Sequence, residues 1–162
     1  MASVRVILVF MLILLSGCGF QLRGLAVSDT QPQYRLVNHS GETAFGERLA
    51  QTMARRHLLL SGSNDEAPAL HVHSFDRLQR QLATDAQGRT VEWQMTIEVT
   101  ISLGVSQYDG QQHDLQVSDK WSVDPDNVLA GSADIAQIKR GVEQEMINRI
   151  IQTLFTWQSN GN

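Results

Sequence analysis

One segment of the chain alternates strictly between apolar and polar residues over fifteen positions, from Val91 to Val105. Every odd position is apolar: Val91, Trp93, Met95, Ile97, Val99, Ile101, Leu103 and Val105. Because successive side chains of a strand point to opposite faces, this pattern predicts a strand with one buried and one wet face. A slip of one residue would expose all eight apolar side chains, each worth about 1.5–3 kcal/mol when buried, so the register is firmly set.

Two further strands are predicted on either side of this segment. Residues 70–82 read as its hairpin partner, joined through the loop Asp85-Ala86-Gln87-Gly88, in which Gly88 can adopt a positive φ. Residues 113–123 form the next strand, with Asp119 interrupting its apolar side. An interruption of that kind is typical of a bulge or of a sheet edge. The stretch 124–127, which contains Pro125, then ends the sheet.

Two segments have the spacing of an amphipathic helix. In residues 43–60 the apolar side chains recur at steps near four and seven, and the Ser61-Gly62-Ser63 run is expected to end the helix. In residues 134–156 a continuous apolar stripe runs from Ile135 to Leu154, and Asp134 with Gln137 resembles a capping box. A short strand is expected at 34–37, ahead of the first helix.

The element order is therefore β-α-β-β-β-α. Two helices with one apolar face each and a sheet with one apolar face are buried most simply in two layers. The sequence predicts an α+β fold, a two-layer sandwich with two helices packed on a four-stranded, mainly antiparallel sheet. Residues 33–162 are expected to form this single domain.

The length of the predicted hairpin also bears on function. Fifteen strand residues span roughly 45–50 Å, whereas a domain of this size is just under ~40 Å across. We therefore expect the hairpin to project at the loop 85–88. Three arginines lie near this tip: Arg77, Arg80 and Arg89. Such a tip is placed to meet a partner, although plain solvation of the loop is an equally good interpretation.

The first residues have the features of a lipoprotein signal peptide. Arg5 is followed by an uninterrupted apolar run from Val6 to Leu15, too short to span a bilayer, and then by Ser16-Gly17-Cys18. The only cysteine thus occupies the acylation position of a lipobox. We expect residues 1–17 to be cleaved, Cys18 to carry a diacylglycerol and an N-acyl chain, and residues 18–32 to form a lipidated tether. The residue after the cysteine is Gly19, whereas an aspartate at this position would be a signal for retention in the inner membrane. We therefore expect the outer membrane as the location.

Charge and composition exclude some classes of function. Without Arg5 the chain has 12 basic and 17 acidic residues, hence a net charge of −5, and no basic stripe suggests nucleic-acid binding. Ten of those basic residues are arginine, whose planar guanidinium binds phosphate groups in pairs of hydrogen bonds. Base composition of the genome explains that bias equally well.

The polar residues offer little chemistry for an enzyme. The chain has no Gly-x-Ser-x-Gly elbow, no His-Glu-x-x-His motif and no cysteine beyond Cys18. We therefore expect no catalysis and no cofactor. His71 and His73 share a strand face, with His113 on a nearby strand, and could hold zinc. Ordinary surface histidines are the favoured interpretation, so no metal is expected.

Three segments together carry a family resemblance: Ser16–Arg23 around the lipobox, Glu92-Trp93-Gln94-Met95 at the start of the long strand, and Asp126–Ala130 before the last helix. With them the chain resembles the LPS-assembly lipoprotein family (LptE, formerly rare lipoprotein B). The resemblance implies two helices on a four-stranded sheet, as the periodicity predicts independently.

The same resemblance implies partners and a site. The family plugs and helps to assemble LptD, the outer-membrane β-barrel that delivers lipopolysaccharide (LPS) to the cell surface. It also implies LPS binding by basic residues near the hairpin tip, for which Arg77, Arg80 and Arg89 are the candidates. The resemblance implies a second basic position just before the last helix, and in this chain that place holds Gly131 and Ser132, neither of which is basic. An accessory role in another envelope complex is the alternative.

Overall fold

The computed structural model describes residues 32–62, 64–126 and 128–160, and the side chains of 128–134 and 158–160 are not part of that description. The lipobox, Cys18 and the expected tether up to residue 31 lie outside the described residues. The compact unit that remains spans Pro32–Asn162.

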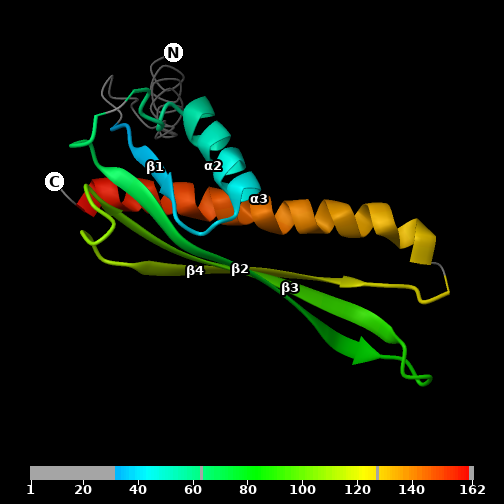
Figure 1. Ribbon diagram of the computed structural model, residues 1–162. Helices are drawn as coiled ribbons and strands as arrows, with labels where there is room; N and C mark the ends of the chain where they lie inside the picture. The colour runs from blue at the N-terminus through cyan, green and yellow to red at the C-terminus, as the bar shows by residue number, and fades with distance from the viewer. Residues whose placement is uncertain (1–31, 63, 127, 161–162) are drawn as a thin grey trace, which may run out of the picture. The chain divides into compact units, whose positions relative to one another are not determined.

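The elements follow the predicted order. They are β1 (Arg35–Asn38), α2 (Thr43–Arg55), β2 (Ala69–Thr84), β3 (Thr90–Gly104), β4 (His113–Ser122) and α3 (Val128–Asn160). The strands form one sheet in the order β1-β2-β3-β4, in which only the β1–β2 pair is parallel. Figure 1 shows both helices lying over the same face of this sheet. The expected α+β fold, with two helices on a mainly antiparallel sheet, is confirmed.

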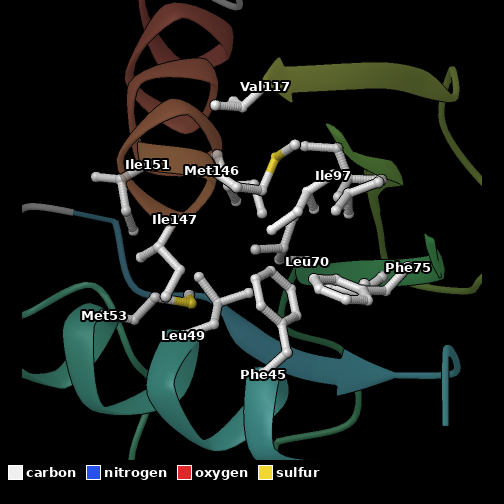
Figure 2. Close-up of a cluster of buried hydrophobic side chains, with 14 of the residues drawn as sticks. Phe45, Leu49, Met53, Leu70, Phe75, Ile97, Val117, Met146, Ile147 and Ile151 are labelled. Carbon is white, nitrogen blue, oxygen red and sulfur yellow. The ribbon is translucent and has the colours of Figure 1, made fainter. Parts of the chain in front are cut away.

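The core fills the space between the sheet and the helices (Figure 2). Met95, Ile97 and Ile101 of β3 are fully buried, as the alternation predicts. The rings of Phe45 and Phe75 lie 4.5 Å apart between α2 and β2. From α3, the fully buried side chains include Met146, Ile147, Ile150 and Ile151. Burying one such side chain contributes about 1.5–3 kcal/mol, so this cluster holds both helices on the sheet.

The first helix is shorter than expected, because it ends at Arg55 and not near Gly62. His57 takes a left-handed conformation with φ 58°. The His57 N–H bonds the Ala54 carbonyl (3.0 Å) and the Leu58 N–H bonds the Met53 carbonyl (2.9 Å), which together form a Schellman cap. The following residues run alongside Tyr34, and Leu58 is buried there. The leucines of 58–60 therefore belong to an extended segment and not to the helical stripe.

The last helix is longer than expected, because it begins at Val128 and runs for 33 residues. A capping box at Asp134 and Gln137 is therefore wrong: these positions lie inside the helix. No proline interrupts residues 128–134, and the single Gly131 costs a helix only about 1 kcal/mol. The helix can thus start soon after the turn at 125–126.

The two expectations for Asp119 have different outcomes. β4 pairs with β3 in an unbroken register from Glu92↔Ser122 to Ile101↔His113, so there is no bulge at Asp119. β4 is an edge strand, as the other interpretation required. The Asp119 carboxylate accepts the backbone N–H of Lys120 at 2.8 Å, and Arg149 donates to the Gln116 carbonyl at 2.7 Å. Side chains thereby occupy backbone groups of β4, which is how natural edges resist unwanted pairing.

Candidate functional site: the hairpin arginines and the polar sheet face

Arg77 lies on the helix-facing side of β2, opposite Ile97 in the ladder. Its Nη2 is 3.6 Å from Oε2 of Glu143, and its guanidinium lies 5.2 Å from the centre of the Phe75 ring. Glu143 belongs to α3, is only 9% exposed, and also pairs with Arg48 of α2. A buried carboxylate needs partners. Arg77 therefore helps to balance an internal charge that joins α2, α3 and β2.

Arg80 lies on the opposite, polar face of β2. Its Nε donates to Oε1 of Gln94 at 2.7 Å, across the strand pair. Leu78 shares this face, opposite Thr96, and is 54% exposed; Leu82 follows at 40%. The arm of the hairpin therefore carries a guanidinium between two exposed leucines.

Arg89 directly follows the tip loop and is held by two carboxylates. Its Nε donates to Oδ2 of Asp85 at 2.8 Å, and its Nη1 donates to Oδ1 of Asp126 at 2.6 Å. These two bonds raise the pKa of Arg89. Asp126 lies in the loop between β4 and α3, so Arg89 joins two loops that are 37 residues apart. Nothing in the local sequence pattern indicates this link.

The structure does not gather the three candidate arginines into one cluster. Arg77 and Arg80 point to opposite faces of β2, and Arg89 lies beyond its end. Their surroundings also differ. Arg89 pairs with two carboxylates. Arg77 and Arg48 share a single carboxylate, that of Glu143. Arg80 bonds a neutral amide. Of the three, Arg80 has the surroundings best suited to an anionic group.

The polar face of the sheet carries a groove of about 340 Å³ between β2, β3 and β4. Three carboxylates line it, from Asp76, Glu98 and Asp114. Thr100 Oγ1 donates to Oδ1 of Asp114 at 2.7 Å, and Gln116 Nε2 donates to Oε1 of Glu98 at 3.2 Å. This groove is acidic and polar. It suits a polar or cationic contact surface and repels phosphate.

The histidines of β2 are arranged differently from expectation. His71 is 3% exposed, so it is not a surface residue. Its Nδ1 lies 3.3 Å from Nε2 of His39, which follows β1, and His73 Nε2 lies 2.8 Å from Ser102 Oγ. His113 instead packs against Trp157. Across the ranges that the structure describes, no group of three or more His, Cys, Asp or Glu could hold a metal ion.

Burial is the main cause that lowers the pKa of both His71 and His73. The neighbouring His39 acts in the same direction on each, and Arg35 adds to the effect at His71. The three rings have centres 5.6–6.2 Å apart. A second proton on this cluster would therefore be repelled by the first. The surroundings therefore favour neutral imidazoles at His71 and His73, where β1 meets β2.

Comparison with known proteins places the fold. No family model matches the chain, and no curated protein matches its sequence. Solved structures do match. The crystal structure of the rare lipoprotein B from Shewanella oneidensis superposes with a TM-score of 0.67 at 14% identity, over 79% of this chain and 97% of that one.

Two further structures agree. The solution structure of the uncharacterized lipoprotein B from Nitrosomonas europaea gives a TM-score of 0.69 at 15% identity, over 88% of this chain and 94% of that one. A minor lipoprotein from Acinetobacter baumannii gives 0.61 at 15%, over 76% and 90%. At these identities the likeness establishes the fold. It is the fold of solved bacterial lipoproteins, rare lipoprotein B among them, as the resemblance implies.

No helix in the described ranges is both long and apolar enough to cross a membrane.

Proposed function

We propose that this chain is an outer-membrane lipoprotein of the LptE type, anchored through acylated Cys18, that plugs and helps to assemble the LPS-transporting β-barrel LptD. The observation that carries the proposal is the combination of the lipobox at Ser16-Gly17-Cys18 with the fold of rare lipoprotein B. Neither suffices alone, because lipoboxes precede many folds. The role is one of assembly and transport, without catalysis.

The polar face of the sheet supports a place inside a barrel. Its β3 side chains are Glu92, Gln94, Thr96, Glu98 and Thr100, whereas Ser102 is buried against His73. The lumen of a large outer-membrane barrel is polar. Such a face can contact it through hydrogen bonds without burying apolar surface, while the helices cover the other face.

The experiment is a pull-down of the tagged lipoprotein from detergent-solubilised outer membrane, followed by mass identification of the bound proteins. A stoichiometric LPS-transport barrel is the expected result. A different envelope complex would favour the accessory-subunit alternative, and a preparation with no partner would contradict both. Cys18→Ala serves as the control for anchoring. It should stay soluble or in the inner membrane as precursor, and normal outer-membrane fractionation of this variant would contradict lipidation.

For LPS delivery, we propose that Arg80 makes the phosphate contact, with Leu78 beside it for acyl chains. Arg80 bonds only a neutral amide within the described residues, whereas two carboxylates already hold Arg89. The test measures LPS retained by the purified lipoprotein. Arg80→Gln should lose more LPS than Arg89→Gln, which removes the same charge. Equal losses would mean that net charge, and not this contact, governs retention.

A further inference from the structure

The second half of β2 has a free edge. β1 pairs only with Ala69–Val72, and β3 lies on the other side of β2. Among the described residues, no strand lies on the outer side of β2 from Ser74 to Thr84. From Asp76 onward all but one of these residues is exposed, so this edge is open to solvent. Figure 1 shows β1 beside the first part of β2 only.

An open edge presents unpaired backbone groups. In an antiparallel pair, residues that bond the neighbouring strand alternate with residues that direct both N–H and C=O to the outer side. β2 pairs with β3 in an unbroken register from Ser74 to Gln81. Every second residue of this stretch therefore presents both backbone groups on the outer side. Such a row is a template for a further strand.

The two edges of the sheet differ in their protection. On β4, the Asp119 carboxylate and the Arg149 guanidinium bond backbone groups at 2.8 and 2.7 Å. In the second half of β2, the side-chain bonds among the described residues run to other side chains, from Arg80 to Gln94 and from Arg77 to Glu143. Proline and lysine, which commonly blunt natural edges, do not occur in β2.

A free edge is unfavourable inside a barrel. The proposed function surrounds this domain with a barrel wall, and backbone groups that are shielded from water need hydrogen-bond partners. The wall strands cannot supply them, because each strand of a closed barrel is already paired on both sides. Loops between wall strands are free to do so. The partner of the edge is therefore a segment that enters the lumen in extended form.

The side chains beside the edge define the chemistry of that segment. Asp76 lies opposite Glu98 of β3, and both line the polar groove. Among the described residues neither carboxylate has a cationic partner, and Glu98 accepts a hydrogen bond from the neutral Gln116. Like charges directly opposite each other destabilise a sheet. A basic side chain beside Asp76 would remove this repulsion.

We infer that the edge Ser74–Gln81 of β2 binds an extended segment of the barrel partner as an additional strand of the sheet, with a basic side chain of that segment beside Asp76. The inference rests on the proposed function and adds which edge of the domain is bound. The pairing uses backbone groups, so the side chains of Leu78 and Arg80 stay on the polar face, where the LPS contact is proposed.

The experiment measures amide hydrogen exchange at single-residue resolution, in the full lipoprotein alone and in its purified complex with the barrel. Every second amide of residues 75–81 should be unprotected in the free lipoprotein and exchange about tenfold slower in the complex. The outward amides of residues 114–118 on β4 are the matched control and should change much less. Equal slowing on both edges would indicate general shielding from solvent, and no slowing on β2 would indicate an unpaired edge. Either result would overturn the inference.

The same measurement distinguishes the other occupants of the edge. Protection of all these amides in the free lipoprotein would overturn the inference, and a dimeric mass would then assign the edge to a second copy. A barrel that co-purifies without slowing exchange on β2 would overturn the inference alone. A lipoprotein that brings down no barrel would overturn the proposed function, and this inference with it.

A charge reversal tests the basic contact. Asp76→Lys places a cation beside the expected basic side chain and should lower the recovery of the barrel several-fold. Asp114→Lys, which makes the same change on the β4 side of the same groove, should lower it less. Both positions are exposed, so the thermal midpoints of the two variants should match. Equal recovery of the barrel by the two variants would overturn the contact at Asp76.

Discussion

The two halves of β2 belong to one strand but have different surroundings. From Ala69 to Phe75 every side chain is buried or half-buried, and the Phe75 ring packs against Phe45 of α2. From Asp76 to Thr84 all but one residue is exposed, and Leu78 and Leu82 face solvent. Figure 1 shows this second half curving away from the helices with β3. The first half supports the fold, and the second half presents a surface.

An apolar residue therefore contributes differently to stability in each half of this strand. In the covered half it contributes to the core, where its loss is costly. In the exposed half the same residue type adds little to stability and is available to a partner. Substitutions that are chemically alike should therefore have opposite outcomes in the two halves.

The largest effect is expected from a charge in the covered half. Ile101 of β3 pairs with Val72 of the covered half. Ile101→Asp places an unpaired carboxylate where the native side chain is fully buried, and should unfold the domain at a cost of several kcal/mol. The matched change Leu78→Asp in the exposed half should leave the thermal midpoint nearly unchanged. Equal loss of stability in the two variants, measured by circular dichroism, would contradict the division of β2.

The second effect is at the junction of the halves, where Arg48, Arg77 and Glu143 join both helices to β2. Glu143→Gln removes the charge that two arginines share and should destabilise the domain by about 1–3 kcal/mol. Chemical denaturation measures this. Both arginines are close to half exposed and can turn to water, so Arg77→Gln should cost less than Glu143→Gln. The reverse order would contradict a central role for Glu143.

A smaller effect is expected from pH, through the histidines of the covered half. Burial lowers the pKa of His71 and His73, so the unfolded chain binds more protons than the folded chain as the pH falls below about 6.5. Their contribution to stability is therefore present above that pH and lost on acidification. His73→Gln should flatten the slope of unfolding free energy against pH between about 7.5 and 5. A slope that His73→Gln leaves unchanged would contradict this contribution.

The smallest effect is expected at the end of the exposed half. Arg89→Gln breaks the link to Asp85 and Asp126 but removes no buried contact. The thermal midpoint should stay the same, while amide hydrogen exchange in the tip loop 85–88 becomes faster. An unchanged exchange rate would mean that the loop holds itself, through the Gly88 N–H bond to the Asp85 carbonyl and the bonds of the Asp85 carboxylate to the backbone N–H groups of Gln87 and Arg89.

Periodicity predicted the elements well wherever one face of an element is buried throughout. β3 is the clearest case, and its expected buried residues from Met95 to Ile101 are in the core. Element ends were less predictable. α2 stops at a left-handed His57, a conformation that residue type alone does not indicate, and α3 gains a start that lacks any apolar stripe. The end of a helix depends on a few single hydrogen bonds, whereas the apolar face of a helix or strand is fixed by many side-chain contacts.

The candidate site shows the same limit. Proximity in sequence placed Arg77, Arg80 and Arg89 together near the hairpin tip, but the pleat sends Arg77 and Arg80 to opposite faces. Glu143, the partner of Arg77, comes from α3, and Asp126, one of the two partners of Arg89, comes from the β4–α3 loop, each dozens of residues away. His39 likewise joins His71 only because β1 pairs in parallel with β2.

The lipobox motif, the order of the elements, the side of β3 that is buried and the α+β class can all be predicted from the sequence, because each depends on local chemistry or on a repeating pattern. Three other features became known from the folded chain: which half of β2 is covered, which arginine has a neutral partner, and which end of the sheet the chain enters. These features depend on contacts between distant segments. A pattern of apolar and polar residues states which face is buried, but it does not state what lies against that face.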